Sequence, residues 1–345
     1  MKPSGAHRFS RPRAADAPAI HELVAACDLA VIGVPDATPA DIADELAEPD
    51  FNLDTDGWLV HDADGTLVGW AWAGAKGDSD MLDIEVLVRP GVEGLTDELW
   101  RLVLDRAGEL ALERGHDAAT VDIGIYRADT VKQALAKERG FEPGTSFHRM
   151  RVDHEGPVEP PTPIPGLTLH SGETDAVRRE AHQIYQEAFA DHFGFVKNDY
   201  DHWLERRQAQ SITDWSQLAV ARIDGRPAAV LIGNNQFVPD EDCGYVATLA
   251  VLPEHRGKGL GRFLLRHAFA ADAARGRRGT LLHVDSNNTS PALDLYLSAG
   301  MRPVLVIDVW RRLIRPTRAS WSAPPGPLRP VHPPGLSEPP GPSDG

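Results

Sequence analysis

The alternation of apolar and polar residues along the chain predicts the same run of elements twice. Residues 58–73 are typical of two short strands joined at Asp64-Gly65, because glycine readily adopts the positive φ of a hairpin turn. Residues 217–233 repeat this pattern 160 positions later, with Asp224-Gly225 in the turn.

Each hairpin precedes a strand, a helix, a strand, a second helix and a closing strand. In the first copy we expect strands at 84–88, 121–126 and 147–152, a helix at 95–113 and a second helix that ends at Gly140. In the second copy we expect strands at 246–251, 281–285 and 304–314, a helix at 260–274 and a second helix that ends at Gly300. A glycine just past a helix end fits a left-handed cap. Repetition at this long period predicts two duplicated α/β domains rather than a solenoid.

Two proline-rich segments separate these copies from each other and from the end of the chain. Residues 153–166 are expected to form an extended linker, because closely spaced prolines fix φ and remove hydrogen-bond donors. From Pro316 onward ten prolines alternate with Gly and Ser, which favours a disordered, polyproline-like tail. The predicted boundaries are therefore 1–152, 153–166, 167–315 and 316–345.

Composition and charge limit the class of protein. The 345 residues are 42% hydrophobic and 25% charged, which is ordinary for globular domains. The net charge of −16 argues against nucleic acid or an anionic membrane as the main partner, since both need a cationic face. No apolar run is long enough to span a bilayer, and the basic N-terminus does not resemble a secretory signal, so we expect a cytoplasmic protein. Two distant cysteines, Cys27 and Cys243, predict neither a disulfide framework nor a zinc site.

The charge is unevenly distributed between the two copies. Residues 1–152 contain 15 basic and 28 acidic residues, a net charge of −13, whereas the rest of the chain carries −3. Between Arg13 and Lys76 there is no Lys or Arg, but there are thirteen Asp and Glu residues.

A glycine-rich segment in the second copy has the chemistry of an anion site. The strand at 245–251 leads into Arg256-Gly257-Lys258-Gly259-Leu260-Gly261-Arg262 and then an amphipathic helix. Such a turn points backbone N–H groups and the positive end of the helix dipole at one place. No Ser or Thr follows a Gly-Lys pair as in a nucleoside-triphosphate loop, and Arg256 occupies the first glycine position of a dinucleotide fingerprint. A helix-opening turn without a ligand remains the alternative.

Two motifs together resemble the GNAT superfamily of N-acetyltransferases. The first is Arg-x-x-Gly-x-Gly after the strand, and the second is the later run from Val284 to Met301, with Ala-x-x-x-Tyr-x-x-x-Gly followed by Met301 in place of an aromatic residue. The resemblance covers about residues 167–315. The degenerate copy followed by an intact one is similar to mycothiol synthase and related tandem acetyltransferases. It implies two GNAT-like domains, each with a mixed, mostly antiparallel sheet flanked by helices.

The resemblance also implies the roles of particular residues. A main-chain amide between Leu249 and Val251 would bind the oxyanion, residues 256–262 would hold the acetyl-CoA pyrophosphate, and Asn288 would bond the pantetheine or phosphate arm. Tyr296 would protonate the leaving thiolate, for which a phenol is a suitable donor. The position of Tyr296 within the motif favours this role over the alternative of a core tyrosine, whereas Asn288 could equally be a helix N-cap.

The general base is left open. Many GNAT enzymes carry Glu on the strand before the loop, but the aligned residue here is Thr248, which cannot accept a proton usefully. A water, or one residue of the helix expected at 181–192, could take this role, and the candidates are His182, Glu187, Asp191 and His192. Asp285 is expected to serve the strand end.

The first copy lacks the same groups. Its loop reads Arg89-Pro-Gly-Val-Glu-Gly-Leu-Thr96, with Glu93 where anions should lie, and Ala136 stands opposite Tyr296. Glu85, opposite Thr248, is expected to be solvated or paired.

We therefore expect an acetyl-CoA-dependent N-acetyltransferase that acts, in the second domain, on a small and cationic amine, without a metal. The alternatives are a non-catalytic acyl-CoA-binding module and transfer from another acyl donor. Because the first copy is acidic, it is expected to attract a cationic amine toward the cleft between the copies, so acceptor KM should rise with salt. The oligomeric state is not predicted.

Overall fold

A computed structural model describes residues 7–286 and 292–315 of the chain. The tail predicted at 316–345 and Asn288 lie outside these residues. The first part contains β1 (Arg8–Ser10), η1 (Ala14–Asp16), α1 (Ala17–Val31), α2 (Pro39–Leu46), β2 (Gly57–His61), β3 (Leu67–Ala75), β4 (Met81–Val88), α3 (Thr96–Glu113), β5 (Ala119–Tyr126), α4 (Thr130–Glu138) and β6 (Glu142–Asp153). The second part contains β7 (Leu167–Ser171), α5 (Asp175–Ala188), α6 (Tyr200–Ala209), η2 (Trp215–Gln217), β8 (Leu218–Ile223), β9 (Arg226–Asn234), α7 (Val238–Glu241), β10 (Cys243–Val251), η3 (Pro253–His255), α8 (Leu260–Ala274), β11 (Gly279–Asp285), α9 (Ala292–Ser298) and β12 (Arg302–Ile314).

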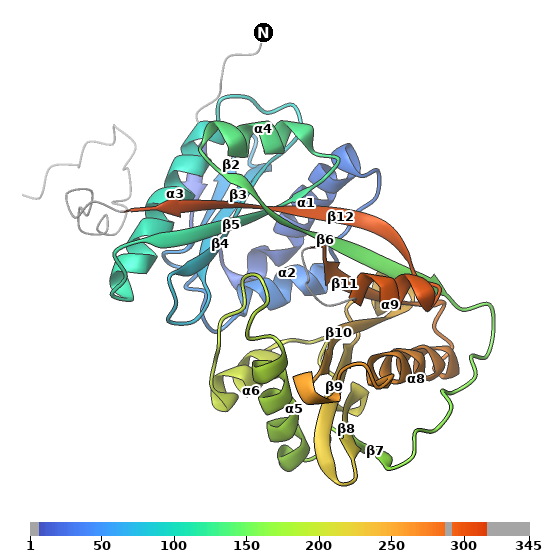
Figure 1. Cartoon of the computed structure of the whole chain (residues 1–345). Helices are drawn as coiled ribbons and strands as arrows, with labels where there is room; N and C mark the ends of the chain where they lie inside the picture. The colour runs from blue at the N-terminus through green and yellow to red at the C-terminus, as the bar shows by residue number, and fades with distance from the viewer. Residues whose placement is uncertain (1–6, 287–291, 316–345) are drawn as a thin grey trace, which may run out of the picture.

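All twelve described strands form one mixed sheet that runs through both copies (Figure 1). The strand order is β1-β2-β3-β4-β5-β12-β6-β11-β10-β9-β8-β7. In each copy one pair of neighbouring strands is parallel, β4 with β5 and β10 with β11, and the other pairs are antiparallel. This agrees with the predicted mixed, mostly antiparallel sheets.

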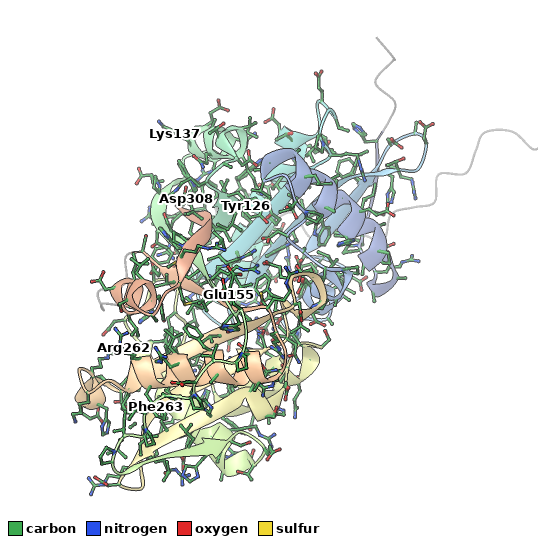
Figure 2. The ribbon with its side chains drawn as sticks, turned by 90° about the vertical axis from the view of Figure 1, so that its right-hand side faces the viewer. Tyr126, Lys137, Glu155, Arg262, Phe263 and Asp308 are labelled. Carbon is green, nitrogen blue, oxygen red and sulfur yellow. The ribbon has the colours of Figure 1, made fainter. Side chains whose placement is uncertain are left out.

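The two copies exchange their closing strands at the centre of this sheet. β6 ends the first copy but pairs with β11 of the second, in the register Phe147 with Asp285. β12 ends the second copy but pairs with β5 of the first, in the register Ile307 with Tyr126. Figure 2 shows Asp308 of β12 close to Tyr126. Each closing strand therefore completes the sheet of the opposite copy.

Ion pairs hold the exchanged strand β12 in place. Arg311 forms two hydrogen bonds of 2.7 Å to the carboxylate of Asp122 on β5. Arg127 pairs with Asp308 at 2.6 Å. Paired, two-point contacts between guanidinium and carboxylate fix direction as well as distance, so they help to set the strand register.

Helices cover both faces of the sheet in each copy. In the first copy α3 packs Leu99 and Trp100 on one face, whereas α1 and α2 pack Ile20 and Leu46 on the other. In the second copy, the face that packs on α8 has a core that includes Leu264, Leu265 and Phe269. Its opposite face packs on α5 and α6, through residues such as Ile184 and Trp203.

Local predictions agree closely with these elements. Both hairpins form, with positive φ at Gly65 and at Asp224-Gly225 in the turns. Gly140 and Gly300 follow α4 and α9 with φ of 77° and 96°. The exchange of closing strands was not predicted. The domain boundaries remain a prediction, because β6 and β12 each belong to one copy in sequence and to the other in the sheet.

One predicted helix was displaced along the chain. A helix was expected at 181–192, but α5 spans Asp175–Ala188, because the Thr174 side chain caps its start by accepting from the Val177 N–H. Beyond this helix Phe193 packs over Gly144 of β6, where an added Cβ would lie 2.9 Å from the ring. The guanidinium of Arg311 lies over the Phe193 ring, with its Cζ atom 3.8 Å from the ring centroid.

Within residues 7–286 and 292–315, no helix is long and apolar enough to cross a membrane. The same residues contain no group of three or more His, Cys, Asp or Glu that could hold a metal ion.

Candidate active site

β10 and β11 separate part of the way along their length. Their parallel pairing ends at Val246 with Leu282, although β10 continues to Val251 and β11 to Asp285. Beyond this point β10 pairs only with β9, and the register shifts between Val246 and Thr248. Successive amides of a strand point to opposite edges, so alternate N–H groups between Thr248 and Val251 face the opening. The separation of β10 and β11 therefore leaves amides of the segment Leu249–Val251 without a strand partner on the β11 side.

The glycine-rich loop lies at the end of this opened strand. Gly257 and Gly259 have φ of 74° and 82°, and an added Cβ at either would meet no atom within 4 Å. Gly259 is the N-cap of α8 and has no side chain to occupy the helix end. The first backbone bond of the helix runs from the Phe263 N–H to the Gly259 carbonyl.

The backbone amides of residues 257–262 therefore have no hydrogen-bond acceptor among the described residues. Together with the helix dipole, such a row of amides favours an anion. Gly261 has a different role, because an added Cβ would lie 3.2 Å from Leu295 of α9. Buried Leu260 anchors the helix start in the core.

Three basic side chains surround the loop and bond mainly to neutral protein groups. Arg256 donates from Nε to the Val251 carbonyl at 3.1 Å and from Nη2 to the Ala188 carbonyl at 3.4 Å. Lys258 donates to the Glu254 carbonyl at 2.9 Å. Arg262, in the first turn of α8 beside Phe263 (Figure 2), donates to Ser298 Oγ at 2.6 Å.

None of the three pairs with a carboxylate in the part of the chain that the structure describes. Their positive charges therefore stay available to a ligand. Arg256 has a second effect, because it ties the end of α5 to the end of β10.

Tyr296 lies on α9 and packs in the core beside α8. Its side chain is buried among a cluster that includes Val246, Leu260 and Leu264. Burial raises the pKa of Tyr296 to about 12. The phenol therefore keeps its proton at neutral pH, as a proton donor must, although it is a weaker acid than an exposed tyrosine.

The candidates for the general base lie in different surroundings. His182 bonds through Nε2 to the Asn198 carbonyl at 3.1 Å and packs against Trp203, which places it in the α5–α6 contact. Glu187 and Asp191 are exposed. Thr248 is buried.

His192 is half-buried in the turn after α5, stacked on Phe189 with ring centroids 4.3 Å apart. Burial lowers the pKa of His192, Asp285 and Asp191 oppose this shift, and Arg256 adds to it. These partners place His192 near the loop and near the end of β11. Asp285 itself accepts a hydrogen bond from Thr145 of β6, so it joins the strand end as expected.

The first copy has a similar backbone with different side chains. β4 and β5 pair only as far as Asp83 with Asp122, so they also separate. Gly91 and Gly94 have φ of 85° and 78°, as in the intact loop.

The side chains at this opening pair with each other. Glu85 of β4 forms an ion pair with Lys132 of α4, which confirms that Glu85 is paired. Arg89 donates to the Leu67 carbonyl, and buried Ala136 provides no hydroxyl.

Comparisons with known proteins agree with this geometry. Residues 178–301 match the acetyltransferase (GNAT) family. A mycothiol acetyltransferase of Actinosynnema mirum is 30% identical over 249 residues, which cover 70% of this chain and 79% of that protein. A GCN5-related N-acetyltransferase from Sphaerobacter thermophilus has the same fold, with a TM-score of 0.73 and 24% identity over 90% of this chain and 96% of that one.

A tandem arrangement is also found among solved structures. The tandem GNAT protein from the clavulanic acid biosynthesis pathway superposes with a TM-score of 0.67 and 17% identity, over 90% of this chain and all of that one. The fold, the matched segment and the relatives lead to one conclusion: the chain belongs to the GNAT acetyltransferase family and is an N-acetyltransferase of tandem architecture, similar to mycothiol acetyltransferases.

Proposed function

We propose that the second copy transfers the acetyl group of acetyl-CoA to the amine of a small, cationic molecule. The observation that carries this proposal is the opening between β10 and β11 next to the uncapped N-terminus of α8. When bound, acetyl-CoA supplies a thioester that an amine can attack. The remaining work of orientation and proton transfer falls to residues of the chain.

The loop holds the phosphates in this proposal. The backbone amides of residues 257–262 supply hydrogen bonds. Lys258 and Arg262 supply full charges, and Arg256 holds the loop against α5. Asn288 lies outside the described residues, so its predicted contact with the cofactor remains a proposal.

The opened strand and two side chains would perform the chemistry. An amide between Leu249 and Val251 donates to the thioester oxygen, where negative charge develops. Neutral His192 accepts the proton of the attacking amine, directly or through a water, and Tyr296 donates a proton to the departing sulfur. Each proton transfer then involves a group that is in the required protonation state at neutral pH.

A labelled-acetyl assay tests this proposal. The purified chain is incubated with isotope-labelled acetyl-CoA and a panel of small amines, and acetylated products are identified by mass spectrometry. We expect label in the amide of a cationic amine, and loss of that product in Gly259→Trp. Gly94→Trp is a matched control, because it places the same side chain at an equivalent positive φ in the first copy. Normal product formation by Gly259→Trp would refute the loop assignment.

A further inference from the structure

A cavity of about 300 Å³ lies between the two copies. The first copy contributes residues of α2, of the segment that follows it and of the β3–β4 hairpin, and the second contributes residues of α5, α6 and their connection. The acidic stretch between Arg13 and Lys76 supplies three of its carboxylates, Glu45, Glu48 and Asp50.

Two of the four acidic side chains that line this cavity form ion pairs with Arg or Lys, and a third lies beside a histidine. Glu48 pairs with Arg206 of α6 at 2.9 Å, and Asp83 pairs with Lys76 at 2.8 Å. Asp50 lies 3.2 Å from His202 Nε2. The contacts of Glu48 and Asp50 join the two copies, whereas Asp83 and Lys76 both belong to the first copy. Asp50 Oδ2 is buried and makes no hydrogen bond with the described residues.

Glu45 is different. Its Oε1 is buried and makes no hydrogen bond with any described residue. Burial raises the pKa of Glu45 to about 8, with Glu85 and Glu48 as further causes. A buried carboxyl group without a partner is costly, and the cost is larger when it is ionised. A ligand that carries a positive charge would remove this cost.

Aromatic rings form the apolar walls of the same cavity. Phe51 and Trp72 from the first copy meet edge to face, with centroids 6.2 Å apart. Tyr185 and Phe195 from the second copy meet in the same way at 5.4 Å. Rings of this kind attract alkylammonium groups through their faces and shield them from water.

The wall of the cavity continues toward the proposed active site. Tyr185 contacts Phe189, with centroids 5.0 Å apart, and Phe189 in turn stacks on His192. One aromatic wall therefore borders both the cavity and the proposed base.

We propose that this cavity binds the second, non-reacting ammonium group of a diamine acceptor, with Glu45 as its counter-ion and the four aromatic rings around its carbon chain. This inference rests on the proposed function, because it assigns the class of acceptor. It requires a substrate with two separated amines, one held in the cavity and one presented at the opening between β10 and β11.

Calorimetry on the full chain tests the proposal. A series of linear α,ω-diamines of increasing length is titrated in parallel with n-alkyl monoamines of matching length. We expect at least one diamine to bind on the order of tenfold more tightly than its monoamine, because a buried charge-assisted hydrogen bond is added. In Glu45→Gln this preference should disappear, whereas Glu22→Gln, which removes an exposed charge on α1, should retain it.

Two readouts separate the inference from the proposed function. CoA affinity of each variant shows that the second copy is folded, and Phe51→Leu provides a second, milder change to the cavity wall that should also weaken diamine binding. Diamine binding that depends on Glu45 without any acetyl transfer would support the cavity site and contradict the proposed acceptor. Equal binding of diamines and monoamines, or an unchanged preference in Glu45→Gln, would overturn the inference even if monoamines are acetylated.

Discussion

At the scale of single residues, burial sets the protonation states on which the proposed chemistry depends. Tyr296 is kept protonated and His192 is kept neutral by the same physical cause, removal from water. The aligned position on β10 carries buried Thr248, which has no acid–base capacity. In the proposed chemistry the base therefore comes from another element, and His192 lies in the turn after α5.

Tyr296→Phe is expected to lower kcat by roughly 10²- to 10³-fold, since general acid catalysis typically contributes this much. The KM for acetyl-CoA should change little, because the ring still packs in the core of the second copy. Tyr245→Phe is the control, since Tyr245 bonds to His283 at 2.8 Å and is not placed in the reaction. Steady-state kinetics measure both, and an unchanged kcat in Tyr296→Phe would exclude it as the proton donor.

If His192 is the base, its pKa determines how the reaction depends on pH. Because the pKa of His192 is lowered, the imidazole is still neutral when the pH falls to the ordinary histidine value of 6.5, and it gains a proton only at lower pH. The acid limb of kcat/KM should therefore lie below pH 6.5. The charged groups that influence it are Asp285, Asp191 and Arg256.

His192→Asn should remove this limb and lower kcat/KM by roughly 10²-fold. His182→Asn should keep the limb, because His182 bonds to Asn198 in the α5–α6 contact. A pH profile of each variant supplies the measurement. If the limb persists in His192→Asn, another group is the base.

At the scale of elements, the two copies share a loop backbone and differ in the side chains around it. Both copies have two glycines at positive φ before a helix and both have a splayed strand pair. They differ in charge, because Lys258 and Arg262 flank one loop and exposed Glu93 lies in the other. The ion pair of Glu85 with Lys132 further occupies the opening of the first copy.

The exchange of β6 and β12 predicts that neither half folds alone. Residues 1–152 expressed separately would leave β5 without its neighbour β12, an exposed strand edge that favours aggregation. By contrast, a protease site inserted at 159–163, cleaved after folding, should leave two fragments that co-elute, because the sheet still joins them. Size-exclusion chromatography measures this. Stable, monomeric halves that do not associate would contradict the exchange.

Local signals in the sequence predicted most of the elements, whereas contacts between distant segments could not be predicted. Asp64-Gly65 and Gly300 act through φ at one position, and so can be read from the sequence. The partner of β12 is β5, about 180 positions earlier, and no local pattern records this pairing. The place of Glu45 in the cavity could not be predicted either, because it depends on the position of α2 relative to α6. Helix α5 was placed too far along the chain, since it spans Asp175–Ala188 and the apolar spacing over 181–192 marks neither of its ends.

At the scale of the whole molecule, the charge asymmetry of the sequence contributes to the contact between the copies. Acids of α2 and of the segment after it meet α6 and the residues beside it: Glu48 pairs with Arg206, Asp44 accepts from Ser211 at 2.9 Å, and Asp50 lies beside His202. Part of the negative charge of the first copy is therefore neutralised within the protein. The cavity lined by Glu45 contains acidic and basic side chains together, the basic ones being Lys76, Lys197 and Arg206.

Salt should therefore weaken acceptor binding more than CoA binding. The KM of a cationic acceptor is expected to rise several-fold between about 50 mM and about 500 mM NaCl, as long-range attraction is screened. The loop amides of 257–262 contact their ligand at short range, so acetyl-CoA KM should rise less. Initial rates over this range test the difference, and a flat response of acceptor KM would remove any role for the acidic copy.

The central claim is that the second copy alone binds acetyl-CoA, and calorimetric titration of CoA into the full chain tests it most directly. We predict one CoA per chain, lost in Gly259→Trp and retained in Gly94→Trp, the matched change in the first copy. Two CoA molecules per chain, or a single one that is lost in Gly94→Trp and kept in Gly259→Trp, would contradict the claim.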